Sequence, residues 1–61
     1  MIKFEYTFYN ISQLKRWLAE KNFNAGSPET FSEWLYNFFD EGNSVSVHGE
    51  KYDYQYCMEL I

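Results

Sequence analysis

The first residues alternate between apolar and polar side chains. One side of the stretch Ile2–Tyr9 holds the apolar residues Ile2, Phe4, Tyr6 and Phe8. The other side is mostly polar, and alternation with a period of two is typical of a strand buried on one face. We therefore expect a strand over Ile2–Tyr9.

A helix is predicted next. Asn10 is a residue type favoured at a helix N-cap, and Gln13 stands three residues later, where a capping box needs it. Apolar residues then recur at helical spacing over Ile11–Asn22. The connector over residues 22–26 is short and contains Gly26, so we interpret it as a turn within one domain.

A second helix is predicted from Ser27 onward, because Ser caps well and Pro28 suits the first helical position. Gly42 has the residue type that ends a helix in left-handed backbone. The apolar stripe between them follows the spacing i, i+3, i+4, i+7. Its members are Phe31, Trp34, Leu35 and Phe38.

Alternation returns over Val45–Tyr56 and predicts a hairpin. A turn at Gly49-Glu50 would place Val47 opposite Tyr52 and Val45 opposite Tyr54. A turn at His48-Gly49 is the alternative. The tail Cys57–Ile61 either continues the strand or makes a helical turn.

The predicted order is β-α-α-β-β. We expect a single small α+β domain over residues 1–61, with a three-stranded antiparallel sheet and both helices packed on one face. The chain holds six Phe, six Tyr and two Trp. That is more aromatic surface than one small core accommodates, so an exposed aromatic patch is expected at an interface.

Composition narrows the setting. The only cysteine is Cys57, which excludes an intramolecular disulfide, and secreted domains of this size usually carry several. There is no signal-peptide pattern and no run of about 18 apolar residues. We expect a cytoplasmic protein, within a bacterial host, that has no membrane partner.

No residue set indicates catalysis. The only candidate nucleophile–base pair is Cys57 with His48, and the predicted hairpin separates the two. Two such ligands are too few for structural zinc. Glu29 and Glu33 share a helix face that nothing desolvates. We expect no enzyme activity, no cofactor and no metal.

Charge is unevenly distributed along the chain. Residues 1–25 carry four basic and two acidic side chains, whereas residues 26–61 carry one basic and seven acidic ones. The acidic half would repel phosphate, which disfavours direct nucleic-acid binding. A minority hypothesis is nucleic-acid binding through the basic first half, with Lys3, Lys15, Arg16 and Lys21.

The acidic half is the candidate partner-binding surface. Its acidic residues also fall at the C-terminal end of the second helix, where negative charge opposes the helix dipole. Acidity could instead serve only to keep an aromatic-rich domain soluble. The candidate partner-binding residues are Glu29, Glu33, Tyr36, Asp40, Glu41, Glu50 and Asp53.

The layout also resembles very small proteins encoded by phages and mobile elements of A/T-rich bacteria. The resemblance lies in Glu33-Trp34-Leu35, Gly42, residues 45–54 and Cys57-Met58-Glu59-Leu60. Several such proteins block host defence enzymes, often through an acidic surface that mimics DNA. The resemblance implies an anti-defence inhibitor and assigns no role to any single residue.

Two hypotheses follow. The first is a non-enzymatic protein-binding module, a phage inhibitor of a host defence or DNA-handling protein, acting through its acidic, aromatic surface. The second is a self-associating, homodimeric accessory or structural protein, paired through the edge strand Ile2–Tyr9 or the tyrosine face.

Overall fold

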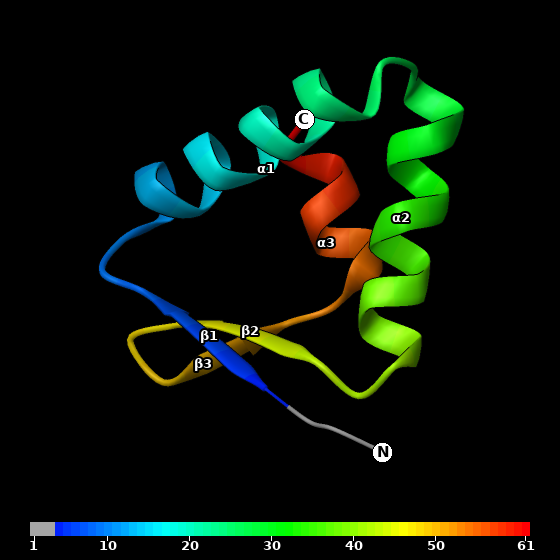
Figure 1. The fold of residues 1–61 in the computed structure, drawn as a ribbon. Helices are drawn as coiled ribbons and strands as arrows, with labels where there is room; N and C mark the ends of the chain where they lie inside the picture. Colours follow the sequence, from blue (N-terminus) through cyan, green and yellow to red (C-terminus); the bar gives the residue numbers. More distant parts are fainter. Residues whose placement is uncertain (1–3) are drawn as a thin grey trace.

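The computed structural model describes residues 4–61, in which three helices cover one face of a small sheet (Figure 1). The α+β class is confirmed. The order is β-α-α-β-β-α, so the chain has one helix more than predicted. The elements are β1 (Glu5–Phe8), α1 (Ile11–Ala25), α2 (Pro28–Asp40), β2 (Ser44–Val47), β3 (Glu50–Tyr52) and α3 (Tyr54–Glu59).

The sheet is mixed rather than antiparallel, which corrects the prediction. Its order is β1-β2-β3, with β1 parallel to β2 and β2 antiparallel to β3. The reason lies in the helices. α1 runs back along the sheet, and α2 then descends towards it (Figure 1). Only one helix reverses the direction of the chain along the sheet, so β2 starts at the same end as β1.

The hairpin takes the alternative turn. Val45 pairs with Tyr52 and Val47 with Glu50, so the turn is His48-Gly49 and the Gly49-Glu50 register is wrong. Both turn residues have positive φ, 53° for the histidine and 80° for the glycine. Two positive φ angles give a turn whose twist matches that of the flanking strands.

The second strand of the hairpin stops early. β3 ends at Tyr52, and Asp53 caps α3 by accepting a hydrogen bond from the Tyr56 N–H at 2.9 Å. Tyr54 and Tyr56 are therefore helical, which contradicts the predicted strand. The alternation of tyrosines concealed a helix start, since aspartate at an N-cap offers the backbone a competing partner.

The two predicted helix starts are confirmed. Asn10 Oδ1 accepts from the Gln13 N–H at 2.9 Å, and Gln13 Oε1 accepts from the Tyr9 N–H at 3.0 Å. Ser27 Oγ accepts from the Thr30 N–H at 3.2 Å. α1 ends three residues later than predicted, at Ala25, because the next residue is the first with left-handed backbone.

The core lies between the sheet and the helices. β1 directs Tyr6 and Phe8 towards the helices. It lies within the predicted strand Ile2–Tyr9 but excludes Phe4 and Tyr9, and Ile2 and Lys3 lie outside the described residues. The buried apolar side chains come from four of the six elements, α1, α2, β2 and α3. They are Leu14, Leu18, Phe31, Leu35, Phe38, Val45, Val47 and Cys57.

Candidate functional site

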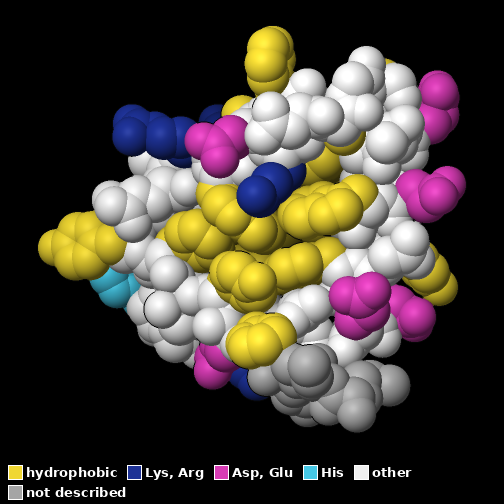
Figure 2. Space-filling model, viewed as in Figure 1, with side chains coloured by type: hydrophobic (Ala, Val, Ile, Leu, Met, Phe, Trp, Pro, Cys, Tyr) yellow, Lys and Arg dark blue, Asp and Glu magenta, His cyan; other side chains and the backbone are white. Residues whose placement is uncertain are grey.

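Three of the predicted binding residues share the outward side of α2, and we call Glu29, Glu33 and Tyr36 the α2 face. With Pro28 and Ser32 they line a shallow hollow of about 500 Å³. The Tyr36 side chain is 60% exposed. Acidic side chains gather along this edge of the molecule, at the right of Figure 2. The structure therefore brings these three residues together on one surface.

Asp40 and Glu41 lie at the C-terminal end of α2 and are exposed. The last turn of the helix contains no basic residue. Their negative charge lies where the helix dipole is also negative, which is electrostatically unfavourable. These two residues extend the acidic edge beyond the α2 face.

The remaining two predicted residues have local structural partners. Glu50 Oε1 accepts a hydrogen bond from the Tyr52 hydroxyl at 3.2 Å. Asp53 is the N-cap of α3, as described above. Glu50 and Asp53 thus belong to the β3–α3 segment, whereas Glu29, Glu33 and Tyr36 line the hollow on α2.

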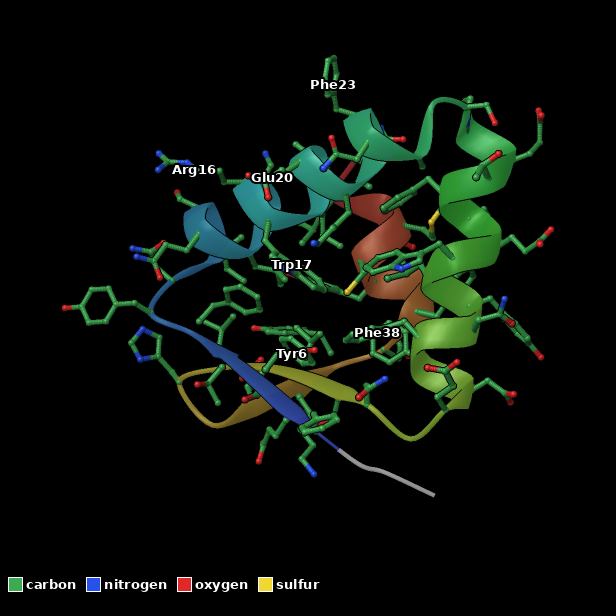
Figure 3. All side chains as sticks on the ribbon, in the orientation of Figure 1. Tyr6, Arg16, Trp17, Glu20, Phe23 and Phe38 are labelled. Carbon is green, nitrogen blue, oxygen red and sulfur yellow. The ribbon has the colours of Figure 1, made fainter. Side chains whose placement is uncertain are left out.

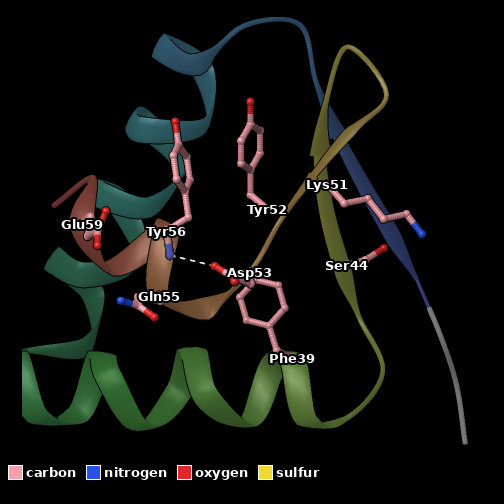
Figure 4. A pocket seen from close by; sticks show the side chains of 8 residues that line it. All are labelled: Phe39, Ser44, Lys51, Tyr52, Asp53, Gln55, Tyr56 and Glu59. Atoms are coloured by element: carbon pink, nitrogen blue, oxygen red, sulfur yellow. Dashed lines mark hydrogen bonds between the residues drawn. The ribbon is translucent and has the colours of Figure 1, made fainter.

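A second hollow, of about 560 Å³, opens beside β3 and α3 (Figure 4). The rings of Tyr52 and Tyr56 stack within it, with centroids 4.3 Å apart. Desolvation, and then the neighbouring Glu50 carboxylate, raise the pKa of Tyr52 above its usual value. The hollow is lined by Phe39, Ser44, Lys51, Tyr52, Asp53, Gln55, Tyr56 and Glu59.

A third hollow, about 420 Å³, lies between β1, α1 and α2, and we call it the aromatic groove. Figure 2 shows hydrophobic side chains gathered there. Its aromatic lining consists of Phe4, Tyr6, Trp17, Trp34 and Phe38, and its polar lining of Lys21, Glu41 and Asn43.

Four of these five rings, those of Tyr6, Trp17, Trp34 and Phe38, form one connected cluster, part of which is labelled in Figure 3. Tyr6 lies 5.7 Å from Trp17 and 5.1 Å from Phe38, measured between ring centroids. Trp34 lies 5.9 Å from Trp17 and 5.4 Å from Phe38. At these separations tilted rings attract one another, so the lining is rigidly packed.

The sequence indicated this groove only in part. The surplus of aromatic residues predicted an exposed patch, and Phe4 at 55% and Tyr6 at 39% exposure confirm that such rings reach solvent. Spacing assigned Trp17 and Phe38 to the inner sides of their helices. The spacing did not show that α1 and α2 leave the core open to solvent beside β1, where the aromatic groove lies.

The only cysteine and the only histidine lie in different parts of the fold. Cys57 is buried in α3, and burial followed by the Asp53 charge raises its pKa to about 11. The thiol is therefore protonated and a poor nucleophile at neutral pH. His48 is exposed in the hairpin turn, with its ring 5.9 Å from that of Tyr9.

Within residues 4–61, no group of three or more His, Cys, Asp or Glu side chains could hold a metal ion. None of the described helices has both the length and the apolar character of a membrane span.

Comparison with known proteins adds no relative. No family model, no curated protein and no solved structure matches this chain. The function is therefore inferred from the surfaces of the molecule itself.

Proposed function

We propose that this chain is a non-enzymatic protein-binding module that docks its α2 face on a basic surface of another protein. One observation carries the proposal: Glu29, Glu33 and Tyr36 line one outward hollow on a helix that contains no Lys or Arg. A surface of a single charge sign favours a partner of the opposite sign and repels others.

Tyr36 is the anchor of this face. Its ring packs edge-on against Tyr54 of α3, with centroids 5.9 Å apart. The Tyr54 hydroxyl is held in turn by a 2.6 Å hydrogen bond with Ser32 Oγ. An exposed aromatic ring already held in place loses little freedom on binding, which suits it to a central interface contact.

The distribution of the acidic residues supports binding over mere solubility. Solubility requires net charge but not its concentration along one helix. Asp40 and Glu41 also oppose the α2 dipole, at a cost of about 0.3–1 kcal/mol each. We infer that this cost is retained because the acidic edge steers a basic partner towards the α2 face.

The partner class follows from the charge. A protein with a basic groove, such as an enzyme that handles nucleic acid, would present Lys and Arg side chains to the carboxylates of the α2 face. Covering that groove would inhibit the enzyme. In this proposal Glu29, Glu33 and Tyr36 make the inhibitory contact.

The proposal is tested by affinity capture with three baits. They are the wild type, the face variant Glu29→Gln/Glu33→Gln, and the control Glu20→Gln/Glu59→Gln, which loses equal charge on α1 and α3. We expect one dominant partner on the wild-type and control baits, reduced about tenfold on the face variant. Equal recovery on all three baits would contradict the proposal.

A further inference from the structure

β1 is one of the two edge strands of the sheet. Within residues 4–61 this strand pairs only with β2, on one side. The Ser44 N–H donates to the Phe4 carbonyl at 2.9 Å. Because peptide groups of successive strand residues point to opposite sides, those of Tyr6 also face β2, while those of Glu5 and Thr7 point outward. The edge therefore offers two N–H and two C=O groups to another strand.

The aromatic groove lies next to β1, on the face of the sheet that the helices cover. Tyr6 and Phe4 of the β1 segment line the groove, whereas Glu5 and Thr7 lie on the opposite, polar face of the sheet. A strand added at the edge would place alternate side chains against the groove and the others on the polar face. The best-matched added strand therefore has the same alternation as β1.

A second copy of β1 fits this edge in one antiparallel register. With a two-fold axis at Tyr6, Glu5 of each copy lies opposite Thr7 of the other, and the outward peptide groups meet as hydrogen-bonded pairs. The two Tyr6 side chains meet at the axis on the groove side. No like charges face each other, and cross-strand aromatic pairs are stabilising.

Charge on the groove side also matches a second copy. Arg16 and Glu20 lie on α1 above the groove, and Lys21 and Glu41 line it (Figure 3). The groove side therefore carries charges of both signs, so a two-fold axis can set unlike charges of the two copies opposite each other. The α2 face, by contrast, carries only acidic side chains and would repel a copy of itself.

We propose that two copies of this chain associate through their β1 edges, in antiparallel register centred on Tyr6, to form one continuous sheet. The dimer covers the exposed rings of Phe4 and Tyr6 and leaves the α2 face of each copy free. It is isologous, since each copy contributes the same strand. The inference is independent of the proposed function, because it uses a different surface.

Substitutions at Thr7 test the register, since this side chain is exposed in the single chain. Thr7→Glu places two Glu–Glu pairs across the dimer, and we expect its dissociation constant to rise roughly tenfold. Thr7→Lys, which places Lys opposite Glu5, should leave it unchanged or lower it. Glu5→Gln/Thr7→Glu removes the repulsion and should restore dimerisation, while Gln can still accept from Ser46 Oγ as Glu5 does at 3.5 Å.

The dissociation constants come from sedimentation equilibrium, with circular dichroism confirming that each variant is folded. Amide exchange supplies a second measurement: the Glu5 and Thr7 N–H groups should become protected as concentration rises. A wild type that remains monomeric at high micromolar concentration would overturn the proposal. A dimer that is insensitive to the charge at residue 7, or one in which these amides still exchange freely, would overturn it as well.

Discussion

Phe38 joins the core to the aromatic groove, and its removal provides a quantitative test of the structure. The side chain is 8% exposed and its ring lies 5.1 to 5.6 Å from those of Tyr6, Trp17 and Trp34. Truncating a buried Phe to Ala costs about 3–5 kcal/mol. A chain of 61 residues has a free energy of unfolding of about 3–9 kcal/mol. We therefore expect Phe38→Ala to lose about a third or more of the stability of the fold, and to be unfolded at room temperature if the wild type lies at the low end of that range.

Urea unfolding followed by tryptophan fluorescence measures this effect, because both Trp rings neighbour Phe38. Phe38→Leu, which keeps most of the volume, should cost about 1.5 kcal/mol. Tyr36→Ala, an exposed change on the same helix, should cost about 0.5 kcal/mol or less. A loss below about 1 kcal/mol for Phe38→Ala would refute the packing described for the groove.

Two further predictions concern the turn and the thiol. His48 has a φ of 53°, so His48→Val should be about 1–2 kcal/mol less stable than His48→Gly in thermal unfolding; equal stabilities would contradict the turn. Folding raises the pKa of Cys57 from 9.0 to about 11, so the thiol's contribution is complete below pH 9 and is lost as pH rises towards 11. The free energy of unfolding of Cys57→Ala should accordingly decline less between those pH values than that of the wild type, and parallel curves would argue against a buried thiol.

Local signals in the sequence predicted local structure well. Asn10 and Ser27 start helices because their side chains accept from orphan N–H groups within the first turn, whatever the rest of the fold does. Pro28 has no N–H to satisfy at the first helical position. Asp53 obeys the same rule, but the tyrosine alternation around it also fits a strand. Packing decided between the two.

Features that depend on distant residues could not be read in this way. The direction of β2 relative to β1 depends on how α2 leaves α1, which no residue in either strand encodes. The hairpin register depended on two neighbouring dipeptides that each contain one glycine. Gly49-Glu50 suits a turn with positive φ at its first position, and His48-Gly49 suits a turn with positive φ at both, so local preference did not decide between them.

The candidate site shows the same division. Glu29, Glu33 and Tyr36 share a helix face, so their spacing was enough to group them. Glu50 and Asp53 were added on charge alone, and each proves to have a nearby hydrogen-bond partner. The open end of the core at the aromatic groove arises from the placement of three elements and has no local signature beyond the surplus of aromatic residues.

The most direct test of the α2 face is the affinity of the captured partner, measured by titration calorimetry at low and at high salt. We predict that Glu29→Gln/Glu33→Gln weakens binding about tenfold and flattens its salt dependence, while the equally charged control Glu20→Gln/Glu59→Gln stays close to the wild type. Equal affinities and equal salt dependence for the two variants would show that the partner binds elsewhere on the molecule.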